Sequence, residues 1–155
     1  MAVIELEALV AAPPERCFDL SLSVELHLDS TAGTGERVVA GVSSGVLALG
    51  DTVTWEARHL GSRRRLTVQV TEFDRPQHFR DVQLEGPFRR MAHDHWFQCA
   101  ENATRMRDRF EFATWLPVFD RVVLVPHLRG LLGRRNAAIR GAAEGEGWRR
   151  YLQSG

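Results

Sequence analysis

The stretch from Arg90 to Phe112 constrains the fold of this chain more than any other part of the sequence. Its side chains alternate along two runs separated by Glu101 and Asn102, which is the pattern of two antiparallel strands joined by a tight turn. Residues two apart on a strand share a face. The second strand therefore has one face rich in arginine and one apolar face, which a single carboxylate, Asp108, interrupts.

A turn at Glu101 and Asn102 also predicts which side chains lie opposite one another on the two strands. The predicted pairs are Phe97 with Met106, His95 with Asp108, and His93 with Phe110. Two imidazoles and one carboxylate are therefore expected to point inward from an otherwise apolar sheet surface.

Regular turn signals divide the sequence before this hairpin into further strands. We predict strands at residues 3–10, 37–42, 52–60, 64–73 and 79–85, and leave open whether 45–47 extend the second of them. Two short helices are predicted, one after Pro13 and one over residues 24–28. Beyond Pro117, apolar residues recur at helical spacings, which predicts a long amphipathic helix that Pro126 interrupts near its start.

This order of elements predicts an α+β fold in one domain, residues 1–155. A curved antiparallel sheet of six or seven strands should be accompanied by two short helices, with the long C-terminal helix over its concave face. A curved sheet closed by one helix leaves room between the two layers. Ligand sites of this kind are concave and mostly apolar, with a few polar groups.

Composition excludes some classes of function. The chain has 20 basic and 20 acidic residues and a formal net charge of zero, whereas a general nucleic-acid binder needs a net basic surface. No apolar run reaches the roughly 20 residues of a membrane helix. The two cysteines lie far apart and no export signal is visible, so we expect a cytoplasmic protein with free thiols. A monomer and a dimer both remain open.

Three segments carry a resemblance to a known family. They are GVLALGDTVTWEARHLG, FRDVQLEGPFRRMAHDHWF and ATRMRDRFEF. Together with the order of elements along nearly the whole chain, they resemble the START-like helix-grip superfamily, also called SRPBCC or Bet v 1-like, and within it the bacterial polyketide cyclase/dehydrase-like branch. The resemblance implies a helix-grip fold. It implies no single activity, because the superfamily contains lipid carriers, hormone and polyketide binders and a few enzymes.

The two histidines of the hairpin are the strongest candidates for chemistry. His95 beside Asp108 is a candidate acid–base pair, since a carboxylate fixes the tautomer of an imidazole and raises its pKa. The alternative is a buried pair that only satisfies its own hydrogen bonds. His93 and His95 with Asp108 also have the spacing of some zinc sites, but nothing else in the sequence forms a dedicated ligand set. We therefore expect neither metal nor cofactor.

Further residues are expected to line the cavity. Alternation places Val53, Trp55, Ala57 and His59 on one inward face and Leu66, Val68 and Val70 on another. The complete set of predicted ligand-binding residues is Trp55, Arg80, His93, His95, Phe97, Met106, Asp108, Phe110 and Leu128. Arg80 depends on the strand register: one register places Arg80 beside His95, and a shift by one residue substitutes Asp81.

Three functions fit these observations. The leading hypothesis is a binding protein for a small hydrophobic or aromatic ligand, lipid-like or polyketide-like, held between the sheet and the last helix. The alternative is an enzyme of the polyketide cyclase, aromatase or dehydratase type, in which His95 is the general base and Asp108 orients it. The third is a structural or partner-binding module with a filled core.

Overall fold

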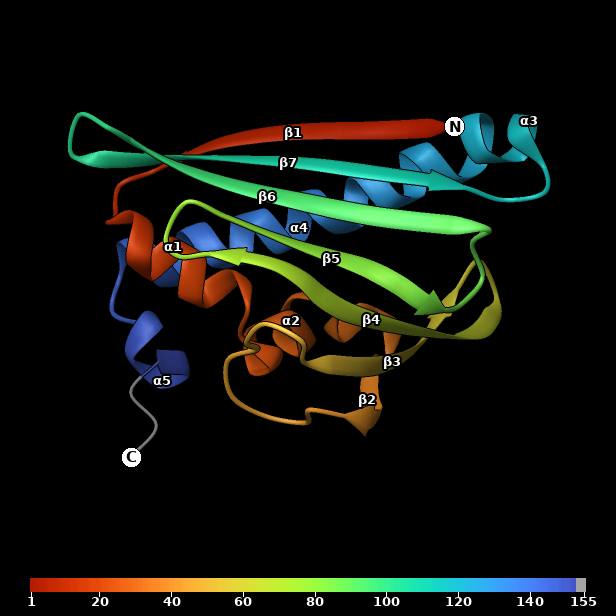
Figure 1. Ribbon diagram of the computed structural model, residues 1–155, viewed down its shortest axis with the longest axis horizontal. Coiled ribbons are helices and arrows are strands. Elements are labelled where there is room, and N and C mark those ends of the chain that lie inside the picture. Colours follow the sequence, from red (N-terminus) through yellow and green to blue (C-terminus); the bar gives the residue numbers. More distant parts are fainter. Residues whose placement is uncertain (153–155) are drawn as a thin grey trace.

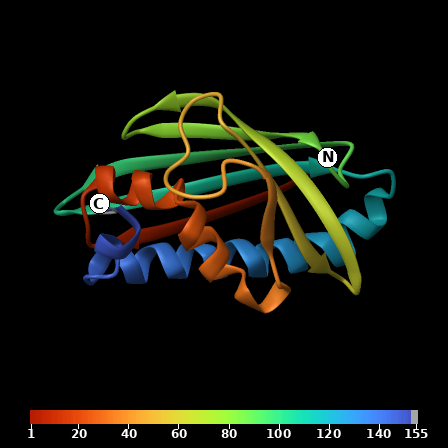
Figure 2. The ribbon, with the colours of Figure 1, turned by 90° about the horizontal axis from the view of Figure 1, so that it is seen from below.

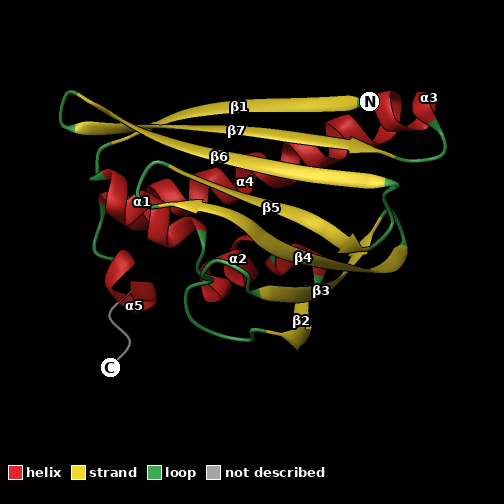
Figure 3. Cartoon of the chain, viewed as in Figure 1, coloured by secondary structure: helices red, strands yellow, loops and turns green. Residues whose placement is uncertain are grey.

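The computed structural model describes residues 1–152, which form one seven-stranded antiparallel sheet and a set of helices on its concave side (Figures 1 and 3). The strands are β1 (Ala2–Val10), β2 (Arg37–Gly41), β3 (Thr52–His59), β4 (Ser62–Asp74), β5 (His78–Glu85), β6 (Arg90–Ala100) and β7 (Ala103–Ala113). Their order in the sheet is β1-β7-β6-β5-β4-β3-β2. The predicted α+β helix-grip architecture is confirmed.

The hairpin of β6 and β7 forms as its alternation predicts. Both turn residues have positive φ, 41° at Glu101 and 64° at Asn102, as a two-residue hairpin turn requires. The three predicted pairs are confirmed, including His95 opposite Asp108. A two-residue turn leaves no freedom in the pairing that follows, which is why the register was readable from the sequence.

Prolines lie in the first turn of three helices, and a glycine ends the longest one. They are α1 (Pro14–Ser21), α2 (Val24–Ser30), the 3-10 turn η1 (Ala32–Thr34), α3 (Pro117–Phe119), the π-helical turn η2 (Asp120–Leu124), α4 (Val125–Glu144) and α5 (Trp148–Leu152). Pro126 lies in the first turn of α4 directly after η2, so the predicted interruption is confirmed. Gly145 ends α4, and α5 is a separate short helix.

Two layers enclose the core. The sheet arches over α4, which runs along its concave side (Figure 2). At one end of the sheet, α1 packs on β6 and β7, and the ring of Phe18 makes edge contacts with Phe73, Phe79 and Phe97 at centroid distances of 5.3–5.4 Å. This end of the molecule is therefore filled by side chains. None of the helices within residues 1–152 is long and apolar enough to cross a membrane.

The register of β5 corrects one prediction. Phe79 lies opposite His95 and Asp81 opposite His93, whereas Arg80 lies opposite Asp94 on the outer face. The connection from β5 to β6 is not a tight turn: pairing stops at Val82, and the Gln83 side chain then bonds the backbone of Phe88 at 2.8 and 3.1 Å. A long connection of this kind does not fix the register.

A second difference concerns the segment after β2. Residues 45–47 do not extend that strand, because Val46 forms an isolated bridge with Ser23 at the start of α2. The Glu25 carboxylate accepts a hydrogen bond from the amide of Gly45 at 2.9 Å. The segment is thus tied to the helical layer, where Leu47 joins the core.

Candidate functional site

A cavity of about 630 Å³ lies between the concave face of the sheet and the helices. Its wall is mainly apolar and includes Val53, Trp55, Val68, Phe110, Leu128 and Leu132. The first four come from the inward faces of β3, β4 and β7, and the two leucines come from α4. The predicted inward faces of β3 and β4 are confirmed, because all seven of their predicted residues border this space.

The cavity opens at the end of the molecule that α3 occupies. Four apolar residues there both line the cavity and are more than a third exposed to solvent: Leu60, Trp115, Leu116 and Phe119. Along β6 from that end, Met91, His93 and His95 line the cavity in turn, but Phe97, two residues beyond His95, belongs to the packed core under α1. The two histidines therefore lie at the inner end, where the cavity meets the core.

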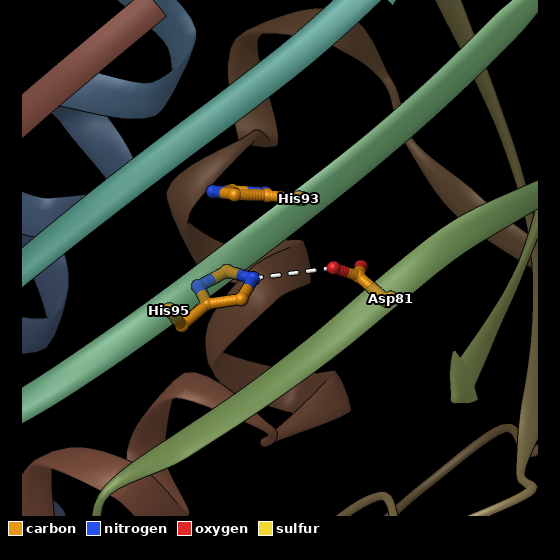
Figure 4. Close-up of side chains that lie close together, drawn as sticks. All are labelled: Asp81, His93 and His95. Atoms are coloured by element: carbon orange, nitrogen blue, oxygen red, sulfur yellow. Dashed lines mark hydrogen bonds and ion pairs between the residues drawn. The ribbon is translucent and has the colours of Figure 1, made fainter. Parts of the chain in front are cut away.

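His95 lies between two carboxylates, of which Figure 4 shows Asp81. Its Nε2 atom is 3.2 Å from Oδ1 of Asp81 on β5, and its Nδ1 atom is 3.0 Å from Oδ1 of Asp108 on β7. The His95 side chain is only 3% exposed, whereas that of Asp81 is 21% exposed. Asp81 is therefore the carboxylate through which this group can reach a molecule in the cavity.

Asp108 on β7 connects the sheet to α4, the helix that covers its concave side. It accepts hydrogen bonds from Nε2 of His93 at 3.1 Å and from Nδ2 of Asn136 on α4 at 2.7 Å. The guanidinium of Arg135 lies 3.7 Å away. Burial raises the pKa of Asp108, but the hydrogen bonds from the two histidines outweigh it and hold that pKa well below its usual range. Asp108 is thus an ionised acceptor behind the cavity wall.

The His95 ring stacks on Phe79 and lies tilted against His93. The ring centroid of His95 is 3.7 Å from that of His93 and 4.0 Å from that of Phe79. Burial, with the neighbouring His95, lowers the pKa of His93 to about 4, so this imidazole is neutral at pH 7. Burial raises the pKa of Asp81, but its contact with His95 prevails and the pKa lies below its ordinary value. The cluster therefore offers rigidly held acceptors and ring nitrogens to the cavity.

The structure brings together only some of the predicted ligand-binding residues. Trp55, His93, His95, Phe110 and Leu128 line the cavity. Arg80 points to the outer face, where it lies 3.5 Å from Asp94. Phe97 and Met106 are buried in the core instead, because α1 fills the space above them.

Sequence reasoning missed Arg135 and Asn136 on α4 and left Asp81 on β5 open. Arg135 is buried, lines the cavity and donates to the backbone carbonyl of Ser21 at 3.2 Å. Its spacing from Leu132 and Ile139, three and four residues, places it on the apolar stripe, and that spacing was the available signal. Asn136, four and three residues from the same two apolar residues, offered the same signal. Asp81 was only the alternative to Arg80.

Comparisons with known proteins bear on the fold. No family model matches the sequence, and no curated protein does. Solved structures do match: TTHA0849 from Thermus thermophilus has a TM-score of 0.69 at 19% identity, with 92% of this chain and 99% of that chain covered. Ara h 8.0201 has a TM-score of 0.69 at 16% identity over 92% and 97%. The major latex-like protein 151 of Panax ginseng has 0.69 at 10% over 93% and 98%. Such identities establish the fold alone: this chain has the Bet v 1-like helix-grip fold.

Proposed function

We propose that this protein binds a small hydrophobic or aromatic molecule, lipid-like or polyketide-like, in the cavity between its sheet and α4. The observation that carries the proposal is the cavity itself, whose volume of about 630 Å³ lies within the range of small-molecule sites, roughly 300–1,000 Å³. Apolar side chains form most of its wall. Asp81, His93, His95 and Arg135 form a polar cluster at its inner end, and other polar residues, such as His27 and His127, lie singly or in pairs elsewhere along the wall. A ligand with an apolar body and one hydrogen-bonding end fits this distribution.

The test begins with the protein as it is purified. Native mass spectrometry should show a mass above that of the chain, and extraction into organic solvent should release the compound. Protein freed of that compound should enhance the fluorescence of an anilinonaphthalene dye in a saturable manner, and the extracted compound should displace the dye. A protein that carries no ligand and binds neither the dye nor a panel of lipids and polycyclic aromatics contradicts the proposal.

A second function is favoured by one further observation, the position of His95 between Asp81 and Asp108. An enzyme of the polyketide cyclase or dehydratase type removes a proton from a carbon beside a carbonyl, and an oriented imidazole is a suitable base. In this alternative His95 takes the proton and Asp108 orients it. The two functions separate in His95→Gln: turnover of a poly-β-carbonyl substrate should disappear while binding persists. Absence of turnover in the wild type leaves only the binding function.

A further inference from the structure

The inner end of the cavity has the arrangement of a metal-binding site. One ligand atom from each of Asp81, His93 and His95 lies within 4.8 Å of the other two. All three side chains border the cavity. Figure 4 shows them close together on the neighbouring strands β5 and β6, with His95 and Asp81 directed toward each other. Zinc binds imidazole nitrogen and carboxylate oxygen at about 2.0–2.2 Å, so two of its ligands in a tetrahedron lie roughly 3.4 Å apart. The 3.2 Å between His95 Nε2 and Asp81 Oδ1 suits such a pair.

The surroundings of the two imidazoles support this interpretation more strongly than the cluster alone. Metal-bound histidines commonly donate their second ring N–H to a carboxylate, which fixes the tautomer and the orientation of the ring. Asp108 accepts a hydrogen bond from Nε2 of His93 at 3.1 Å and lies 3.0 Å from Nδ1 of His95, which the Arg135 guanidinium also approaches at 3.5 Å. Asp108 is itself fixed by Asn136 at 2.7 Å. Each imidazole therefore keeps one nitrogen for a metal: Nδ1 of His93 and Nε2 of His95.

The charges of the cluster also favour a cation. Asp81 and Asp108 are two carboxylates in a largely buried site, and Arg135 is the guanidinium that lies against Asp108 at 3.7 Å. The two carboxylates therefore outnumber the one guanidinium. A buried charge needs a partner, and a divalent ion between Asp81 and the two rings supplies one.

From this geometry we infer that the protein binds a divalent first-row transition metal ion of the zinc type through His93, His95 and Asp81. Two imidazoles and one carboxylate leave a coordination position free, which is the arrangement of catalytic rather than structural zinc sites. That position faces the cavity, because all three ligands line it. An oxygen atom of the organic ligand, or water, completes the coordination. A bound metal occupies Nε2 of His95 and so excludes the alternative in which this nitrogen exchanges a proton with a substrate.

The inference goes beyond the proposed function and does not depend on it. Tag-free protein is stripped with EDTA and titrated with Co²⁺, whose visible spectrum reports coordination number, and with Zn²⁺ by calorimetry. We expect one equivalent of Co²⁺ with the intense bands of a four- or five-coordinate site, displaced by Zn²⁺. Asp81→Asn should weaken binding by more than about 100-fold, and Asp108→Asn by about 10- to 100-fold, since it removes only the support of the rings.

The outer face provides a matched control. Glu72, His78 and Asp94 form a second group with ligand atoms within 4.8 Å of one another, but Glu72 is exposed and His78 half-buried there. His78→Gln should leave Co²⁺ binding unchanged. In the wild type, paramagnetic shifts of the imidazole protons should appear for His93 and His95 and not for His78, a readout that needs no variant to fold. Absence of saturable Co²⁺ and Zn²⁺ binding overturns the inference, and so does binding that His78→Gln abolishes and Asp81→Asn retains.

Discussion

Removal of the Asp108 carboxylate tests whether the cluster is held together as its contacts indicate. In Asp108→Ala, the donors on His93, His95 and Asn136 lose their common acceptor, which now lies 2.7–3.1 Å from each of them. A buried donor left without a partner costs about 1–3 kcal/mol, and loss of one member of a buried charged network about 3–5 kcal/mol. Because water from the neighbouring cavity can replace part of the lost contacts, we expect a destabilisation between about 2 and 5 kcal/mol.

The assay is urea unfolding followed by tryptophan fluorescence, with EDTA present so that metal binding does not contribute. With a slope of about 2 kcal/mol per molar urea, the midpoint should fall by about 1–2.5 M while the slope stays constant. The matched control is Asp94→Ala on the same sheet, whose partners His78 and Arg80 have side chains 21% and 38% exposed. Asp94 is itself buried, but water can reach both partners once its carboxylate is removed, so the control should cost less than Asp108→Ala, about 1 kcal/mol.

The destabilisation caused by Asp108→Ala is compared with that caused by Asp94→Ala. A cost for Asp108→Ala below about 1 kcal/mol, or equal to that of Asp94→Ala, refutes the reasoning that this carboxylate organises the two imidazoles. Asp108→Asn should fall between the wild type and Asp108→Ala. It keeps one acceptor oxygen but places an amide N–H against a donor.

Three other features of the molecule can be tested by simple measurements. Ala57→Phe, which adds a ring to the cavity wall, should weaken dye binding at least tenfold, about 1.4 kcal/mol, whereas Leu84→Phe on the exposed surface should not. Hydrogen bonds from three arginines lower the pKa of Glu56 to about 2. The contribution of this carboxylate to stability is therefore present above about pH 4.5 and is lost as the pH falls towards 2. The difference in urea midpoint between wild type and Glu56→Gln should shrink over that interval. Burial raises the pKa of the Cys17 thiol to about 11, so iodoacetamide at pH 8 should label exposed Cys99 alone until urea unfolds the chain, as mass spectrometry would show.

The sequence was most informative where local chemistry determines geometry. Strict alternation and a two-residue turn at Glu101 and Asn102 specify both the facing and the pairing of β6 and β7, and those are confirmed residue by residue. Alternation also predicted the inward face of β3 and β4. The helical stripe predicted the lid, and Pro126 and Gly145 fall at its irregular start and at its end.

The remaining features depend on contacts between distant parts of the chain. Nothing in the sequence of β6 and β7 shows that α1 fills the space above Phe97 and Met106, so these two were expected in the cavity and lie in the core. The position of Arg135 among apolar side chains follows from partners on other elements, including the carbonyl of Ser21, more than 100 residues away in the sequence. The extent of a cavity is set by such packing and is not carried by any one segment.

The register of β5 shows how much of the chemistry depends on a single such detail. With Arg80 beside His95, the inner end of the cavity would carry a second guanidinium besides that of Arg135 and would select a carboxylate ligand. A shift by one residue sends Arg80 to the outer face and brings Asp81 to 3.2 Å from His95. The same histidines then share their surroundings with two carboxylates, and the site favours a proton, a metal ion or the hydroxyl of a ligand. The Asp81→Asn variant therefore also tests ligand selectivity. If the Asp81 carboxylate governs that selectivity, removing its charge should shift the binding preference among matched ligands from alcohols and phenols towards carboxylates.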